Sequence, residues 1–210
     1  MKAILFDLGH TLVELDYDWL ASLLRRETDR PVEAVDLRAA ERRARYRLDD
    51  ELMADEGASR LPEAAARYRE LVRRELGLPA DGAWKTAVRQ MLEEDARDVG
   101  LWRILMPGVA STLHALAREG WRMGVVSNAD GRVEQILEAT GVRRYFDVVV
   151  YSRLIGIEKP DPAVFRPALE ALEVPPEEAI YVGDLPGVDG AAARRAGLGF
   201  LLVDPTGGAG

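Results

Sequence analysis

The chain has 210 residues, of which 48% are apolar, and carries a net charge of -8 with an isoelectric point near 5.0. This length fits one large domain, or a domain with an insertion, that can bury a sizeable core. The acidic balance argues against nucleic acid as a partner, because binding to nucleic acid depends on Lys and Arg that neutralise phosphates. The chain has no cysteine, which excludes disulfides and thiolate sites and leaves oxygen-ligated cations as the natural metal option.

The apolar pattern predicts neither a signal peptide nor a membrane span. Only four apolar residues separate Lys2 from Asp7, and no apolar run approaches the roughly 18 residues that cross a bilayer. We therefore expect a cytoplasmic protein without a membrane partner. Nothing in the sequence predicts an oligomeric state.

The first predicted element is a buried strand, Lys2–Phe6, within the opening stretch MKAILFDLGHTLVE. Asp7 follows this strand directly, and open α/β proteins place ligands just beyond the carboxyl ends of their strands. A lone Asp in this position is also common as a helix cap or turn former. Its meaning therefore depends on what the other strands carry.

Residues 15–103 read as one helix after another and interrupt the alternating pattern of the rest. The helical stretches are SLLRRE, LRAAERRARYRLDDEL, PEAAARYRELVRREL and WKTAVRQMLEEDA, with breaks at Pro31, Gly57, Pro62 and Gly77–Gly82. They predict a small helical bundle that covers the ligand-binding edge of the sheet. Arginines of the second stretch are surrounded by acids, which predicts a solvated helix face with ion pairs.

Strands and helices alternate again in residues 104–210. The predicted strands are mostly continuous apolar runs, as in a parallel sheet covered on both faces: Arg122–Val126, Asp147–Tyr151, Ala179–Val182 and Gly199–Val203. The predicted helices between them are Gly108–Glu119, a segment after Asp130 that ends at Gly141, one that begins at Asp161 and Pro162, and Gly190–Ala196. This series predicts an α/β fold with a doubly wound parallel sheet.

Polar side chains follow four of these strands. Asp7 follows the first strand, Ser127 follows MGVV, Lys159 lies in the loop after DVVVYS, and Asp184 follows AIYVG. The carboxyl ends of parallel strands share one edge, so we expect these groups to converge. The chain has only three lysines and one asparagine, yet Lys159 and Asn128 both fall in these loops, in EKPDP and VVSNAD. This usage favours a functional site.

Four motifs, FDLGHTL, VVSN, EKP and VGDLPGVD in this order, resemble those of the haloacid dehalogenase (HAD) superfamily of hydrolases with a helical cap inserted after the first motif. The resemblance covers nearly the whole chain, strongly in the α/β part and weakly in the insert. It implies a Rossmann-like core formed by residues 1–14 and 104–210, and a helical cap domain formed by residues 15–103.

The resemblance also implies roles for five side chains. Asp7 matches the family's nucleophile, Ser127 and Lys159 match the groups that hold the phosphate, and Asp184 and Asp189 match acids that hold magnesium. Asp189 would be a direct metal ligand or would lie behind the direct ligands, and it could also cap the helix that follows it.

The chemistry of these residue types supports the assignment. A carboxylate such as Asp7 can attack phosphorus and form an acyl phosphate that water then hydrolyses. A phosphate dianion would repel Asp7, so a hard cation such as Mg²⁺ is needed near Asp7 and Asp184. Lys159 supplies a positive charge and the Ser127 hydroxyl a donor for the phosphate. Asn128 could contact the phosphate or shape its own loop.

The usual general acid of the family's phosphatases is absent. Those enzymes carry a second Asp two residues after the nucleophile, where it protonates the leaving alcohol, and this chain has Gly9 there. General acid catalysis contributes roughly 10²- to 10⁴-fold to the rate. Gly9 can still offer its backbone carbonyl to the metal. His10 is a candidate replacement acid, with a turn or packing role as the alternative.

The sequence therefore predicts a hydrolase, a Mg²⁺-dependent phosphatase that acts on a small phosphorylated metabolite through an aspartyl-phosphate intermediate on Asp7. One alternative is a haloacid dehalogenase without metal, because a halide leaves without a proton and needs no acid at Gly9. Against it, the acids Asp184 and Asp189 would repel a carboxylate substrate. A second alternative is a non-catalytic domain of this fold that binds a phosphorylated ligand or a protein partner.

Overall fold

A computed structural model describes residues 2–54 and 61–203, with side chains described except at positions 61 and 62. The chain forms two compact units: residues 1–15 together with 102–210, and residues 16–101. We call them the α/β unit and the helical unit. The predicted break at Gly57 lies outside the described residues. In the described part of the chain, no helix is long and apolar enough to cross a membrane.

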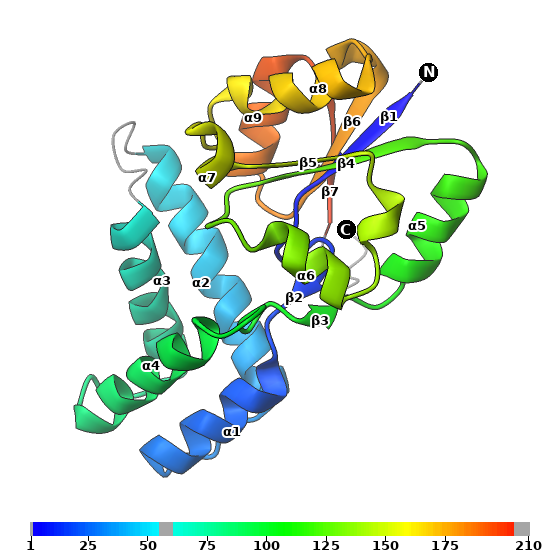
Figure 1. Cartoon of the computed structure of the whole chain (residues 1–210). Coiled ribbons are helices and arrows are strands. Elements are labelled where there is room, and N and C mark those ends of the chain that lie inside the picture. Colours follow the sequence, from blue (N-terminus) through cyan, green and yellow to red (C-terminus); the bar gives the residue numbers. More distant parts are fainter. Residues whose placement is uncertain (1, 55–60, 204–210) are drawn as a thin grey trace. The chain divides into compact units, whose positions relative to one another are not determined.

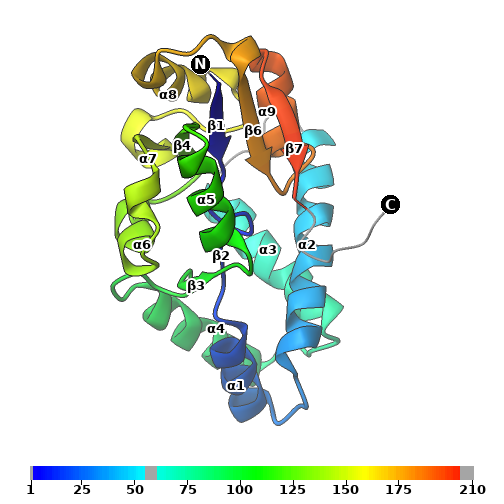
Figure 2. The same ribbon diagram turned by 90° about the vertical axis from the view of Figure 1, so that its right-hand side faces the viewer.

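The α/β unit is built on a five-stranded sheet in which every neighbouring pair is parallel, with strand order β5-β4-β1-β6-β7 (Figure 1). The strands are β1 (Ala3–Phe6), β4 (Arg122–Ser127), β5 (Val148–Tyr151), β6 (Ala179–Gly183) and β7 (Gly199–Leu202). Figure 2 shows β1 and β6 side by side in this sheet. The chain winds outward from β1 in both directions, which confirms the predicted doubly wound α/β fold.

Helices cover both faces of this sheet. The α helices of the unit are α5 (Val109–Arg118), α6 (Val133–Ala139), α7 (Ser152–Ile155), α8 (Arg166–Leu172) and α9 (Val188–Ala196). Short 3₁₀ turns are η1 (Arg143–Tyr145), η2 (Pro162–Phe165) and η3 (Pro176–Glu178). In Figure 1, α8 and α9 lie on one face of the sheet and α5 and α6 on the other. All four predicted helical segments are present.

The core on the α8 and α9 face follows from the alternation of side chains along the strands. Leu5 of β1, Val126 of β4 and Tyr181 of β6 are fully buried there. They pack in one cluster with Phe165, which directly precedes α8, and with Leu172, the last residue of α8. Each fully buried side chain of this size stabilises the fold by about 1.5–3 kcal/mol, and the cluster holds the strand ends that carry the predicted site.

Gly124 lies at a tightly packed position of the sheet. A Cβ atom added there would lie 2.7 Å from Val148 Cγ1 and 2.9 Å from Leu5 Cδ2. We expect Gly124→Ala to destabilise the protein by about 1–3 kcal/mol, because both neighbours belong to strands that pair with β4. Urea unfolding measures this loss. Gly82→Ala is the matched control, since its new Cβ meets nothing within 4 Å. Equal stability of the two variants would contradict the close packing around Gly124.

The described residues of the helical unit form the helices α1 (Tyr17–Thr28), α2 (Ala34–Ala54), α3 (Leu61–Glu75) and α4 (Gly82–Asp95). Asp16 and Asp81 cap α1 and α4 by accepting hydrogen bonds from backbone N–H groups. Pro62 lies in the first turn of α3, where a missing N–H costs no helical hydrogen bond. The predicted helices are therefore present, and the predicted break at Pro62 is shifted to the start of a helix.

The prediction of a solvated face on α2 is only partly right. Arg43 and Arg47 are exposed and pair with Glu75. Glu41, however, is 2% exposed. Its carboxylate accepts hydrogen bonds from Tyr17 Oη at 2.9 Å and Tyr68 Oη at 2.5 Å, and pairs with a buried arginine of the same helix. Burial raises the pKa of Tyr68 well above its ordinary value, and the Glu41 charge raises it further.

A two-stranded antiparallel pair links the two ends of the insertion. Its strands are β2 (Val13–Glu14) and β3 (Ile104–Leu105), with Val13 opposite Leu105. The backbone N–H of Met106 also donates to the carbonyl of Leu12 at 3.0 Å. The chain therefore leaves and re-enters the α/β unit at adjacent points. The sequence pattern did not predict these strands, because two residues carry no periodicity.

Candidate active site

The loops at the carboxyl edge of the sheet bring the predicted residues together. Asp7 follows β1, Ser127 ends β4, and Asp184 follows β6. Lys159 enters from the loop between α7 and η2, and Asp189 lies in the first turn of α9. All five are at most 8% exposed. Charged groups are rarely buried to this extent unless they are paired or bind an ion.

Lys159 lies at the centre of this group. Its Nζ donates to Asp7 Oδ1 at 2.7 Å, to Asp189 Oδ1 at 2.8 Å and to Tyr181 Oη at 2.6 Å. These acceptors engage all three ammonium protons. Burial alone would lower the pKa of Lys159, but the charges of Asp189 and Asp7 outweigh it and raise that pKa. The ammonium group is therefore a fixed positive charge beside the predicted nucleophile.

Asp189 ties the loop after β6 to Lys159. Its Oδ2 accepts hydrogen bonds from the backbone N–H of Asp184 at 3.1 Å and of Leu185 at 3.0 Å. Burial raises the pKa of Asp189, the Lys159 charge opposes this rise, and the net direction is upward. The neighbouring Gly183 leaves room for this contact, because a Cβ there would lie 2.6 Å from Asp189 Oδ2.

The acidic cluster suits a hard cation. Asp7, Asp184 and Asp189 each offer a carboxylate oxygen, and these atoms lie within 4.8 Å of one another. An all-oxygen donor set of this kind is what Mg²⁺ prefers in proteins. Both oxygens of Asp189 already accept hydrogen bonds, which favours a place for Asp189 behind the direct ligands.

Asn128 shapes the loop of Lys159. Its side-chain Nδ2 donates to the carbonyl of Lys159 at 3.0 Å, and its Oδ1 accepts from the backbone N–H of Lys159 at 2.9 Å. The sequence leaves two roles open for Asn128, and this contact supports the one in which its side chain shapes the loop. The adjacent backbone N–H of Ala129 donates to Ser152 Oγ, so the loops after β4 and β5 are held together.

Gly9 and His10 form a tight turn after the predicted nucleophile. His10 has a left-handed backbone with φ of 56°, and its N–H donates to the carbonyl of Val13 at 2.6 Å. The His10 ring is buried and meets the Trp102 ring edge to face, with centroids 4.9 Å apart. This geometry favours the turn and packing role of His10. Its role as a proton donor stays a prediction.

Tyr181 is the residue of this group that the sequence did not reveal. Its hydroxyl accepts from Lys159 and donates to the carbonyl of Val126 at 2.7 Å, and its ring packs edge to face on Phe165. Burial raises the pKa of Tyr181 well above its ordinary value, so the phenol is neutral. In the sequence, a lone tyrosine in the aliphatic run AIYVG was the only available signal.

We expect Tyr181→Phe to destabilise the protein by about 1–3 kcal/mol, because it leaves the buried carbonyl of Val126 and one proton of Lys159 without their partner. Urea unfolding measures the difference. The matched control is Tyr145→Phe, which removes a hydroxyl that accepts an exposed hydrogen bond from Arg144 and should change stability by less than about 0.5 kcal/mol. A Tyr181→Phe protein as stable as this control would contradict the described network.

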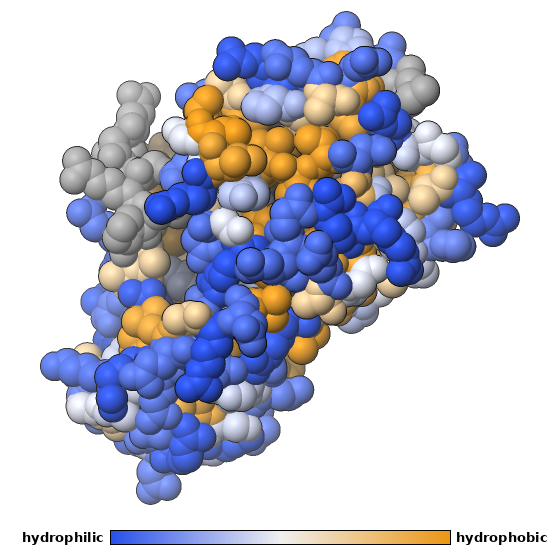
Figure 3. Space-filling model, in the orientation of Figure 1, coloured by the Kyte–Doolittle hydropathy of each residue, from blue (hydrophilic) through white to orange (hydrophobic). Residues whose placement is uncertain are grey.

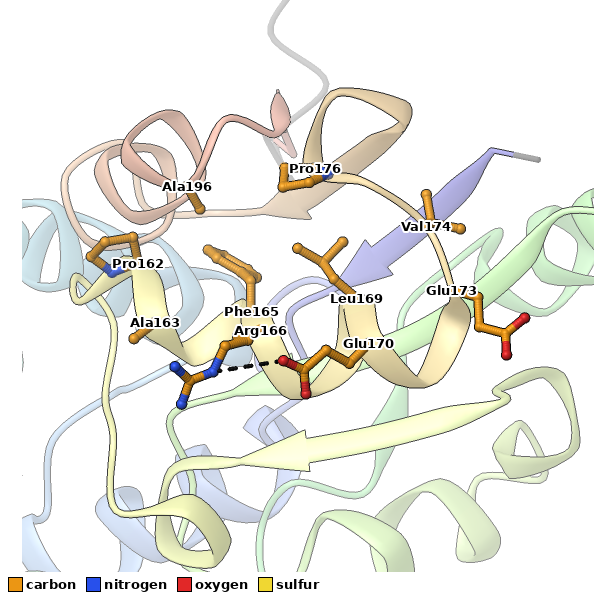
Figure 4. A pocket seen from close by; sticks show the side chains of 10 residues that line it. All are labelled: Pro162, Ala163, Phe165, Arg166, Leu169, Glu170, Glu173, Val174, Pro176 and Ala196. Atoms are coloured by element: carbon orange, nitrogen blue, oxygen red, sulfur yellow. Dashed lines mark ion pairs between the residues drawn. The ribbon is translucent and has the colours of Figure 1, made fainter.

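Other surface features of the α/β unit lie apart from these residues. A groove of about 640 Å³ runs along α8 and is lined mainly by apolar residues such as Phe165 and Leu169. Figure 4 shows these side chains together with the Arg166–Glu170 ion pair. None of the converging polar residues lines it. Figure 3 shows apolar surface near β5 and α7, where Leu154 is 62% exposed. The candidate site is therefore the buried polar group at the carboxyl edge.

Comparisons with known proteins agree with this geometry. A family model described as haloacid dehalogenase-like hydrolase matches residues 1–197. The mouse protein named haloacid dehalogenase-like hydrolase domain-containing protein 3 is 34% identical over 175 residues, which are 82% of this chain and 68% of that protein. A phosphoserine phosphatase from Thermus thermophilus is 37% identical over 150 residues, covering 70% of this chain and 59% of that enzyme.

A solved L-2-haloacid dehalogenase has the same fold, with a TM-score of 0.64 at 20% identity over 99% of this chain and 88% of the other. The chain spans about half the length of several curated relatives that it matches. The family match nevertheless extends over both units and includes every residue of the candidate site. The chain is a hydrolase and belongs to the haloacid dehalogenase-like hydrolases.

Proposed function

We propose that this hydrolase is a Mg²⁺-dependent phosphatase that acts on a small phosphorylated metabolite, with Asp7 as the nucleophile. The observation that carries the proposal is the buried contact between Lys159 and Asp7, surrounded by Asp184 and Asp189 at the carboxyl edge of the sheet. Relatives named as phosphatases for phosphoserine, glyceraldehyde 3-phosphate and phosphoglycolate support the substrate class.

In the proposed reaction, Asp7 attacks phosphorus while the bond to the leaving oxygen breaks, which gives an aspartyl phosphate. Water then hydrolyses this acyl phosphate and restores the carboxylate. Lys159 holds Oδ1 of Asp7, so the attack falls to Oδ2. The fixed orientation of Asp7 lowers the entropic part of the barrier.

The phosphate would meet positive charge and donors from several sides. Ser127 would donate its hydroxyl to a phosphate oxygen, and Lys159 would exchange one carboxylate contact for the phosphate. A Mg²⁺ ion held by Asp7, Asp184 and the Gly9 carbonyl, with Asp189 behind them, would neutralise the repulsion between Asp7 and the phosphate dianion. Asn128 would keep the Lys159 loop in place.

We assign the helical unit, inserted a few residues after Asp7, to a cap that selects the substrate. The dehalogenase alternative is weaker, because the acids around Asp7 would repel a carboxylate substrate. The binding-domain alternative is also weaker. A domain that only bound a phosphorylated ligand would have no use for a nucleophile such as Asp7, held in place by Lys159.

The test is release of p-nitrophenol from its phosphate ester by the purified protein, with Mg²⁺ or with a chelator. The ester suits this site because its leaving group needs little protonation. We expect turnover only with Mg²⁺, above the background of Asp7→Asn. No turnover above that background would contradict the proposal, and release of halide from a 2-haloacid without metal would favour the dehalogenase alternative.

A further inference from the structure

The space beside Gly9 is filled by the indole of Trp102. A Cβ atom added to Gly9 would lie 3.0 Å from Cζ3 and 3.2 Å from Cη2 of Trp102. Gly9 does not have a left-handed backbone, so its own backbone does not demand glycine. The neighbouring indole therefore occupies the space that a side chain at this position, two residues after Asp7, would need.

Trp102 is held in this place from two sides. Its ring meets the buried ring of His10 edge to face. The segment that follows Trp102 forms β3, which pairs with β2 directly after the His10 turn. Gly9 in turn forms a β-bridge with Val13. The Gly9 turn and the backbone that carries Trp102 are thus parts of one hydrogen-bonded structure in the α/β unit, which fixes the Cα of Trp102 near Gly9.

We propose that Trp102 is a specificity-determining residue that restricts the enzyme to phosphates whose leaving group departs without a proton, such as aryl or acyl phosphates. This inference rests on the proposed phosphatase function. The indole places ring carbon atoms, which carry no acidic proton, beside the nucleophile loop. The stretch from Leu8 to Val13 holds one ionisable side chain, His10, and its ring is packed on that indole.

The consequence for the reaction is a strong dependence on the leaving group. The bond from phosphorus to the leaving oxygen breaks as Asp7 attacks, and the departing oxygen keeps the electron pair. A weakly basic phenolate or carboxylate can leave with this charge, whereas an alkoxide needs a proton in the transition state.

The contact itself can be tested without any activity. Gly9→Ala should lower the midpoint of urea unfolding in the wild-type background, because its Cβ meets the indole. The same substitution should cost clearly less in the Trp102→Ala background. Equal shifts of the midpoint in the two backgrounds would overturn the assigned contact.

The specificity is tested with p-nitrophenyl phosphate, phenyl phosphate and a simple alkyl phosphate at saturating Mg²⁺. We expect wild-type kcat/KM to fall by roughly 10²- to 10⁴-fold from the first to the last. The double variant Gly9→Asp/Trp102→Ala should reduce this ratio of kcat/KM values by at least about tenfold. The carboxyl group of the new Asp has room there and can donate a proton to the leaving group. Gly9→Asp alone should not reduce the ratio, because the indole of Trp102 still occupies the space that the carboxyl group needs.

The outcomes separate the two proposals. Turnover of alkyl and aryl phosphates at similar rates by the wild type, or equal behaviour of Gly9→Asp and the double variant, would overturn the role of Trp102 and leave the phosphatase function standing. No Mg²⁺-dependent turnover of any phosphate would remove the phosphatase function, and the role of Trp102 with it.

Discussion

Asp7→Asn is expected to lower kcat for phosphate esters by on the order of 10⁴- to 10⁶-fold. The substitution keeps the shape of the side chain but replaces the attacking carboxylate oxygen by an amide that is a poor nucleophile. Lys159 keeps its contacts with Asp189 and Tyr181 in this variant. The fold should therefore survive, and the loss should be specific to catalysis.

The matched control is Asp50→Asn, which makes the same change at an exposed position of α2. It should leave kcat unchanged within experimental error. Circular dichroism and urea unfolding would show that both variants are folded. An Asp7→Asn protein that retains turnover within tenfold of the wild type would exclude Asp7 as the nucleophile.

Lys159→Met is expected to reduce both stability and activity. The lysine is 3% exposed and pairs with two buried acids, so its removal leaves their charges uncompensated. Breaking a buried ion pair on one side typically costs about 3–5 kcal/mol. Loss of a fixed cation beside the reacting phosphate should reduce kcat/KM by roughly 10²- to 10³-fold. Urea unfolding and p-nitrophenyl phosphate turnover measure the two effects.

Lys85→Met is the control for this change, because Lys85 is exposed on α4, and it should alter stability by less than about 0.5 kcal/mol. If Lys159→Met does not fold, Lys159→Arg still carries the test. This variant keeps the positive charge, but the planar guanidinium group of Arg does not match three acceptors that are arranged around a single nitrogen atom. Wild-type stability and turnover in both Lys159 variants would contradict the central place given to this residue.

The sequence was sufficient to predict the sheet and the edge where the site lies. Continuous apolar runs such as MGVV and AIYVG are typical of buried parallel strands, and the rule that ligands bind at their carboxyl ends placed Asp7, Ser127 and Asp184 together. The unusual positions of a rare lysine and the single asparagine were informative as well. In the structure, the side chain of Asn128 contacts the backbone of Lys159.

Contacts between distant segments could not be predicted in this way. Tyr181 looks like an ordinary core residue until its hydroxyl is found on Lys159. Glu41 belongs to an arginine-rich helix that suggests a solvated surface, yet two tyrosines bury it. Trp102 follows the helical unit in the sequence, and the short β2–β3 pairing brings its segment to the Gly9 turn. No local pattern encodes such pairings.

The most direct test of the proposed chemistry is to trap the covalent intermediate. The protein is mixed with p-nitrophenyl phosphate and Mg²⁺, quenched with acid within milliseconds, and its N-terminal peptide is analysed by mass spectrometry. We predict that this peptide gains the mass of one phosphoryl group on Asp7, that hydroxylamine removes it, and that Asp7→Asn shows none. Rapid turnover with no adduct, or with the adduct on another residue, would contradict nucleophilic catalysis by Asp7.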